Sequence, residues 1–155
     1  MFKEDYFVRR SWPLSSILLA AAGFTLVIMG MYFILVRPPL LPEDVRYMAL
    51  PAAQIDAVKP ALESWLTRVF QVMGGYVLAT GALTITLAAT AFRARHWAAA
   101  AGALIGGATS IGWMAYVNFV INSDFKWVLL GMALLWASSL VIFWFETRAQ
   151  NTVMR

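Results

Sequence analysis

Four long apolar stretches with almost no charge constrain the fold of this chain more than any other feature. They cover residues 14–36, 65–92, 97–121 and 127–145 and hold 19 to 28 residues each. A helix needs about 20 apolar residues to cross a hydrocarbon core about 30 Å thick. The chain is 61% hydrophobic and 13% charged, whereas soluble domains are roughly 45–50% apolar and 25% charged. The sequence therefore predicts an integral membrane protein with a single domain, residues 1–155.

The pattern within each stretch favours helices over the strands of a β-barrel. Backbone groups in lipid need hydrogen-bond partners within their own segment or a closed barrel, and barrel strands alternate in polarity over about 10 residues. The run "LLAAAGFTLVIMGMYFILV" shows no alternation. The connections "RARHW" and "NSDFKW" are short, so neighbouring helices must run antiparallel. We expect an all-α bundle of four transmembrane helices, with the first helix retained rather than cleaved as a signal peptide.

The basic residues predict the orientation of this bundle. The side with both termini and the loop containing Arg93 and Arg95 holds seven Lys or Arg and three acids, and the other side holds five of each. The positive-inside rule then places both termini in the cytoplasm. Because the basic residues lie scattered at helix ends, we expect them to contact lipid headgroups, and we do not expect nucleic acid as a partner.

The long connection at residues 37–64 is predicted to be a folded outer cap of short helices. It contains five of the six prolines. Pro42, followed by Glu43 and Asp44, is typical of a helix start, and Pro51 and Pro60 are expected to start two further helical pieces. The cap is either a docking surface or lid, or a self-contained unit whose charges pair with each other. Its candidate functional residues are Glu43, Asp44, Arg46, Tyr47 and, at the start of the second span, Arg68.

Small residues suggest how the spans pack, because they let helix backbones approach closely in lipid. The second span carries Gly75, Ala79 and Ala82, and the third carries Gly102, Gly106 and Ser110. We expect the second and third spans to contact each other through these residues, with the first and fourth spans facing lipid or a partner. The alternative is that Gly and Ala are simply frequent in membrane spans.

Two segments, "PPLLPEDVRYM" and "LESWLTRVFQVMGGYVLATGALT", resemble small bacterial four-span membrane proteins of no assigned function. The resemblance covers about a third of the chain, the cap and the second span. It implies a protein of the bacterial inner membrane and implies no activity.

Candidate chemistry is sparse. The centres of the spans hold no ionisable residue, the chain has no cysteine, and its one histidine is His96 at a helix start. We therefore expect no catalytic residue, no metal site and no cofactor. Asn118, with Tyr76 and Tyr116 at similar depth, is a candidate outer pocket for a lipid or quinone headgroup. The alternative for Asn118 is a structural hydrogen bond or a helix cap.

These observations favour a non-enzymatic accessory or assembly subunit that docks to a larger membrane complex, through other integral membrane subunits or by self-association. The second hypothesis is a small-molecule binder or carrier, for a lipid or a quinone, with a pocket between helices near the outer face. An enzyme is not expected.

Overall fold

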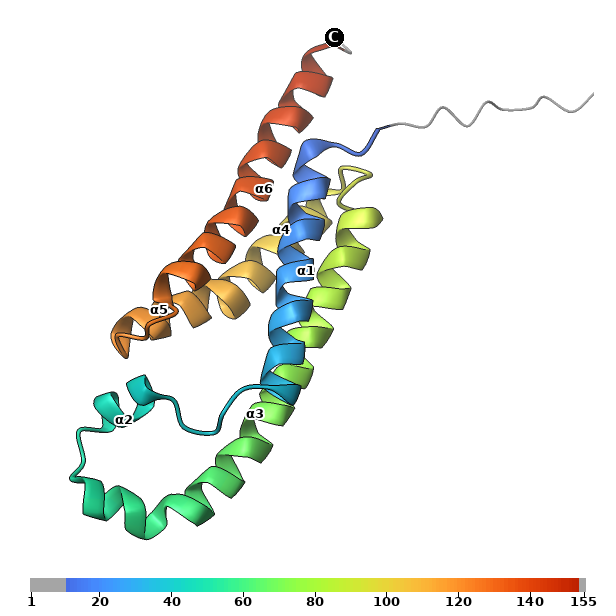
Figure 1. The fold of residues 1–155 in the computed structure, drawn as a ribbon. Coiled ribbons are helices and arrows are strands. Elements are labelled where there is room, and N and C mark those ends of the chain that lie inside the picture. Colours follow the sequence, from blue (N-terminus) through green and yellow to red (C-terminus); the bar gives the residue numbers. More distant parts are fainter. Residues whose placement is uncertain (1–10, 154–155) are drawn as a thin grey trace, which may run out of the picture.

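The structure, a computed structural model, describes residues 11–153, and the side chains of Ala52 and of residues 150–153 are left out of the description. Its helices are α1 (Leu14–Leu35), α2 (Pro42–Met48), α3 (Ala52–Ala89), α4 (Trp97–Gly107), a π-helical turn η1 (Ala108–Gly112), α5 (Trp113–Val120) and α6 (Lys126–Val153). Since α4, η1 and α5 run on from one another, the long elements form four rods (Figure 1). Lys3, Arg9, Arg10 and Arg155, which were counted for the orientation, lie outside the described residues.

All four rods are long and apolar enough to cross a membrane. The spanning parts are Leu14–Leu35, Ala53–Ala89, Trp97–Val120 and Lys126–Ala149. The expected all-α, four-helix membrane bundle is therefore confirmed. The tryptophans at the predicted span ends are all exposed, from 40% for Trp12 to 66% for Trp127, as side chains in the two interfacial belts of a membrane protein should be.

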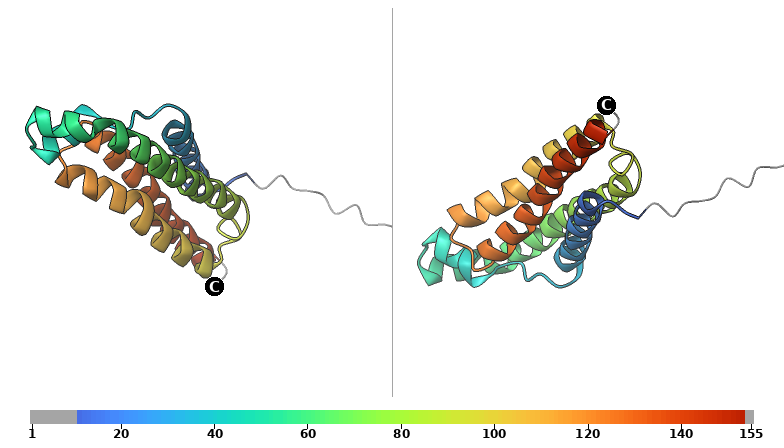
Figure 2. Two further views of the ribbon diagram at one scale, coloured as in Figure 1. Left: turned by 90° about the horizontal axis from the view of Figure 1, so that it is seen from below. Right: turned by 90° about the horizontal axis from the view of Figure 1, so that it is seen from above.

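The four rods do not all touch one another. α1 makes its most extensive contact with α3 and a smaller one with α6, and α6 packs along α4, η1 and α5. α3 and α4 follow each other in sequence but barely touch. Figures 1 and 2 show the α1–α3 pair and the α4–α6 pair as two units, with α2 at one end of the bundle. We call this end the α2 end. The expected close contact between the second and third spans is wrong.

Four glycines bring the backbones of α1 and α3 together. A Cβ added to Gly23 would lie 2.9 Å from the carbonyl oxygen of Gly81, and one added to Gly30 would lie 2.7 Å from that of Gly74. The reverse also holds: a Cβ on Gly81 would lie 2.6 Å from the oxygen of Gly23, and one on Gly74 would lie 2.8 Å from that of Gly30. We call these four residues the α1–α3 glycine seam. It explains why α1 is held so closely although its central polar side chain, Thr25, bonds to the carbonyl oxygen of Ala22 in its own helix.

The small residues predicted to form a seam on the second span point elsewhere. Gly75, Ala79 and Ala82 are exposed, and a Cβ on Gly75 would meet nothing within 4 Å. Each residue in a helix turns by about 100°, so Gly74 and Gly75 lie on different faces. The prediction correctly expected small residues of the second span to pack against another helix, but it chose the wrong face. The packed face begins at Gly74, one residue before Gly75.

On the third rod, too, the glycine that packs against another helix lies one residue away from the predicted one: it is Gly107 rather than Gly106. Gly102 meets nothing within 4 Å and is exposed, and Ser110 bonds to the carbonyl of Gly106 in its own helix. Gly107 is buried instead, and a Cβ there would overlap the indole of Trp136 on α6. Trp136 is 3% exposed and donates from Nε1 to the carbonyl oxygen of Ala103 at 2.9 Å. The contact of α4 is thus with α6.

The cap differs from its prediction at Pro60. The predicted starts at Pro42 and Pro51 are confirmed, since α2 begins at Pro42 and Pro51 is the N-cap of α3. Pro60, however, lies inside α3, which continues through it for 38 residues in all. A proline inside a helix removes one backbone hydrogen bond and bends the axis, and Figure 1 shows α3 curving in its first turns.

Candidate functional site at the α2 end of the bundle

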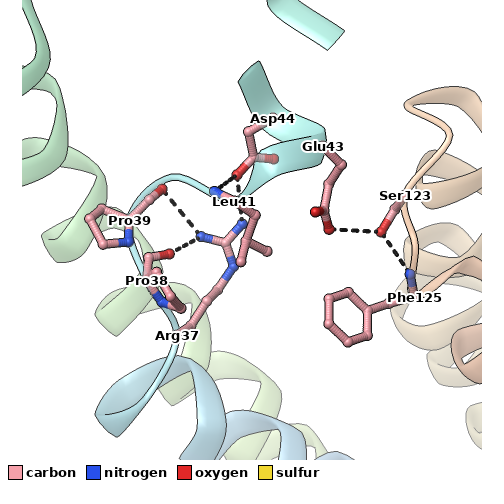
Figure 3. Close-up of polar contacts among 8 residues, drawn as sticks. All are labelled: Arg37, Pro38, Pro39, Leu41, Glu43, Asp44, Ser123 and Phe125. Atoms are coloured by element: carbon pink, nitrogen blue, oxygen red, sulfur yellow. Dashed lines mark hydrogen bonds and ion pairs between the residues drawn. The ribbon is translucent and has the colours of Figure 1, made fainter. Parts of the chain in front are cut away.

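The segment between α1 and α3, residues 36–51, holds α2 in place through a local network around Arg37. Asp44 accepts a hydrogen bond from the backbone N–H of Leu41 at 2.9 Å, which caps the first turn of α2, and it pairs with Arg37 at 3.3 Å. Arg37 also donates to the carbonyl oxygen of Pro38 at 2.8 Å. Figure 3 shows the bonds to Asp44 and to the carbonyl oxygen of Pro38 converging on the guanidinium group of Arg37.

Arg37 also joins this segment to both helices of the α1–α3 pair. Its guanidinium carbon lies 3.5 Å from the ring centre of Phe70 on α3 and 5.4 Å from that of Phe33 on α1. The side chain is only 8% exposed. A cation over an aromatic ring is worth more when it is shielded from water, so the end of α1, the start of α2 and α3 are fixed to one another here.

On its other side α2 contacts the turn between α5 and α6. The hydroxyl of Ser123 donates to the carboxylate of Glu43, which is 3% exposed, at 3.2 Å, and the same hydroxyl accepts from the N–H of Phe125 at 3.1 Å (Figure 3). Arg46 donates to the carbonyl oxygen of Asn122 at 3.0 Å and pairs with Asp124 at 3.1 Å. The α2 segment therefore bridges the two helix pairs.

Beside α2 lies a pocket of about 330 Å³. Its walls come from the α2 segment and from the first three turns of α3. Five of its lining residues are apolar and three are charged: Leu40, Leu41, Pro42, Val45, Ile55, Asp56, Lys59 and Glu63. The pocket is open to the surroundings, and its volume lies at the lower end of the range of small-molecule sites, roughly 300–1,000 Å³.

The structure brings some predicted site residues together and leaves others apart. Glu43, Asp44 and Arg46 lie together in the α2 segment and fix its position, as described above. Tyr47 is 59% exposed, and Arg68 is exposed and bonds to Gln71 on its own helix at 2.9 Å. The expectation that the charges of the cap pair with each other holds only for Arg37 and Asp44 among the described residues. Arg46 pairs with Asp124, outside the cap, and Lys59 is in no ion pair there.

The predicted outer pocket around Asn118 does not coincide with the pocket beside α2. Tyr76 and Tyr116 are 73% and 58% exposed, and Tyr116 lies against Trp113 with ring centres 5.4 Å apart. Asn118 donates to the carbonyl oxygen of Met114 in its own helix at 2.9 Å. None of these three residues lines the pocket beside α2. Asn118 makes a structural bond, the kind of role given as its alternative.

Sequence reasoning missed a polar cluster at the end opposite α2. The carboxylate of Glu146 on α6 accepts from the hydroxyl of Ser15 at 2.6 Å, from Arg95 at 2.5 Å and from the backbone N–H of Leu14 at 3.1 Å. Arg95 also donates to Ser15 at 2.9 Å. We call Ser15, Arg95 and Glu146 the Ser15 cluster. It joins α1, α6 and the α3–α4 loop, and the available signal was a single acid at the end of a span on the same side as a loop with two arginines.

No arrangement suited to metal binding occurs in the described part of the chain, where three or more His, Asp or Glu side chains never converge. His96 is the exposed N-cap residue of α4. The polar contacts at both ends of the bundle join helices to one another. Among the features described, the pocket beside α2 offers space for a ligand.

Comparison of the chain with protein-family models, with curated proteins and with solved structures gives no match.

Proposed function

We propose that this protein is a membrane subunit that docks sideways onto another membrane protein through an exposed face of α3. This face consists of Gly75, Ala79, Ala82 and Thr86, and we call it the exposed α3 face. All four residues are exposed to the surroundings of the bundle. The single observation that supports the proposal most is the open space around Gly75, where an added Cβ would meet nothing within 4 Å.

Physical chemistry explains why such a face suits a protein partner. Lipid tails are as apolar as leucine, so helices associate in a membrane by close packing rather than by a hydrophobic driving force. Close packing needs small residues on one face over several turns. The chain already uses this device internally, in the α1–α3 glycine seam. The spacing of the exposed α3 face, 4, 3 and 4 residues, keeps it on one side of the helix for about three turns.

The residues that flank this face add depth to it. Val72, Tyr76 and Leu83 are 61%, 73% and 70% exposed. Large side chains beside a line of small ones give ridges and a groove, the shape into which the ridge of another helix packs. The proposed partner is therefore a transmembrane helix of another polypeptide.

The proposal includes an orientation and a location, the cytoplasmic membrane of a bacterium, with the end opposite α2 in the cytoplasm. The α3–α4 loop, which contains Arg93 and Arg95, and the C-terminal part of α6, which contains Arg148, lie at that end (Figure 1). The α2 end balances its basic residues with Asp44, Asp56 and other acids.

Because the chain has no cysteine, single cysteines can report the topology. A membrane-impermeant maleimide should label Tyr47→Cys in intact cells and should label Ala94→Cys only after lysis. Labelling in the reverse order would contradict the orientation.

The docking proposal is tested by placing a photo-crosslinking residue at Ala79 in the full-length protein in its native membrane. The expected product is a covalent adduct with a different polypeptide, which mass spectrometry then identifies. The matched control is the same residue at Gly131 on α6, where an added Cβ also meets nothing within 4 Å but no stripe of small residues runs. Adducts of twice the mass of the chain would replace the subunit role with self-association. Equal adducts at both positions, or none at Ala79, would overturn the proposal.

A further inference from the structure

We infer that the pocket beside α2 binds a phospholipid with a primary ammonium in its headgroup, of the phosphatidylethanolamine type. This inference goes beyond the docking proposal and does not depend on it. The pocket belongs to the α2 end, whereas the exposed α3 face lies farther along the same helix.

The position of the pocket matches the headgroup layer of a membrane. α3 has 38 residues, or about 57 Å at 1.5 Å per residue, which exceeds the roughly 30 Å of a hydrocarbon core. The charged residues of α3 all lie in its first half, and Trp65, 60% exposed, marks the expected boundary. Lys59 precedes Trp65 by six residues, or about 9 Å along the axis. The pocket therefore opens about where phosphates and ammonium groups lie.

The pocket combines an apolar wall with alternating charges. Leu41, Val45 and Ile55 contribute apolar surface, and Ile55 is only 7% exposed. The charged lining residues follow one another along α3 at spacings of three and four: Asp56, Lys59 and Glu63. They therefore lie along one face of the helix in the order acid, base, acid. A lipid has the same division between an apolar part and a charged part.

These three charged side chains have no protein partner within the described residues. The ion pairs there join Arg37 to Asp44, Arg46 to Asp124, and Arg95 to Glu146, and the hydrogen bonds do not involve the side chains of Asp56, Lys59 or Glu63. Of the other charges in the α2 segment, Arg37, Asp44 and Arg46 are in ion pairs, and Glu43 accepts a hydrogen bond from Ser123. The cation of Lys59 and the two carboxylates are therefore available to a ligand that carries both signs.

The chemistry of the lining selects among lipid headgroups. The Lys59 ammonium suits a phosphate, and the carboxylates of Asp56 and Glu63 can accept hydrogen bonds from a primary ammonium, which has three donors. A quaternary choline ammonium has no N–H donor and is usually bound by aromatic side chains, and the lining contains none. The glycerol headgroup of phosphatidylglycerol carries no cation. Its negative charge would lie near the carboxylates of Asp56 and Glu63 with no ammonium group to offset the repulsion.

The test is native mass spectrometry of the delipidated, full-length protein offered equimolar phosphatidylethanolamine, phosphatidylcholine and phosphatidylglycerol. We expect selective retention of phosphatidylethanolamine and at least about tenfold weaker retention in Lys59→Ala, since a lost charge-assisted bond is worth about that factor. Arg68→Ala is the matched control, because Arg68 is an exposed base on the same helix that does not line the pocket. Equal retention of the three lipids, or equal losses in both variants, would overturn the inference.

Two further measurements keep the result interpretable. Glu63→Gln conserves shape, so it should fold as the parent protein does and shift the preference from phosphatidylethanolamine toward phosphatidylglycerol; an unchanged preference would contradict the role of the carboxylates. Soluble phosphoethanolamine should fail to displace the lipid at equal concentration, because it lacks the part that contacts Leu41 and Val45. Displacement at equal concentration would mean that the pocket binds a free phosphorylated amine and that the lipid assignment is wrong.

Discussion

The two faces of α3 are built from the same kind of residue and are used differently. One face, with Gly74 and Gly81, lies against α1 so closely that no Cβ fits. The other, with Gly75, Ala79 and Ala82, is open. The two faces start at adjacent residues. The comparison teaches that a stripe of small residues in a membrane helix indicates a packing surface but does not identify which helix packs on it.

The largest expected effect comes from filling the closed face. In Gly74→Leu the new side chain would collide with the carbonyl of Gly30 and with Phe33, and overpacking of a tight contact costs about 1–3 kcal/mol or more. We expect the α1–α3 pair to separate, with a large loss of thermal stability in detergent. Gly75→Leu is the neighbouring control and should not destabilise the protein, because an added Cβ there meets nothing and leucine forms helices better than glycine. Equal destabilisation by both changes would mean that the faces do not differ.

The second effect, at the Ser15 cluster, shows whether the glycine seam holds α1 by itself. Arg95→Ala leaves the carboxylate of Glu146, which is 26% exposed, without its cation, and we expect a loss of about 2–3 kcal/mol. The loss should separate α6 from α1 while α1 and α3 stay together. Disulfide trapping between one cysteine on α1 and one on α3, placed at facing positions along the glycine seam, reports the latter contact. If trapping falls in Arg95→Ala, the seam depends on the cluster.

The third effect concerns the open face and leaves the fold intact. Ala79→Leu should weaken the complex with the partner about tenfold or more, because a large side chain keeps the two backbones apart. Native mass spectrometry of gently extracted membranes measures the bound fraction. Leu104→Ala, a change at an exposed residue of α4, is the control. A bound fraction unaffected by Ala79→Leu would remove the open face from the interface.

The smallest expected effect is the change in stability when either of the adjacent residues Gly74 and Gly75 is replaced by alanine. Gly75→Ala should stabilise the protein by about 0.5–1 kcal/mol, because glycine is a poorer helix former than alanine and the new Cβ meets nothing. Gly74→Ala should destabilise it, because the new Cβ would lie 2.8 Å from the carbonyl oxygen of Gly30. Thermal unfolding of the two variants side by side should give shifts of opposite sign. Shifts of the same sign would contradict the assignment of the two faces.

The sequence predicted those parts of the fold that a single physical rule controls. Hydrophobic length predicted all four spans, and the proline followed by two acids predicted the start of α2 at Pro42. At Pro60 the same reasoning failed, because the preceding turns of α3 continue through a proline whose missing bond only bends the helix. Which helices of the bundle contact one another was not predictable from the sequence. Apolar side chains cover all sides of these helices, so amphipathicity does not mark an interior as it does in water.

The candidate site was predictable only in part. Glu43, Asp44 and Arg46 were found because charges between two spans are conspicuous. Their partner Ser123 and the pocket beside α2 depend on how far α2 reaches toward the α5–α6 turn, which no local pattern specifies. Gly74 was passed over for Gly75, because both residues fit a stripe and only the position of α1 decides between them.

The bond between Glu43 and Ser123 has a consequence for how the chain is made. Its two residues are 80 positions apart, and those of the Ser15–Glu146 bond are 131 apart. A chain is synthesised from its N-terminus, so α1 and α3 can meet while α6 has not yet been translated. The bond of Glu43 must wait until Ser123 is made, and the bonds to Glu146 must wait for the last helix, α6. A ribosome that stops before residue 123 would therefore release a hairpin of α1 and α3 in which Glu43 lacks Ser123 and Ser15 lacks Glu146.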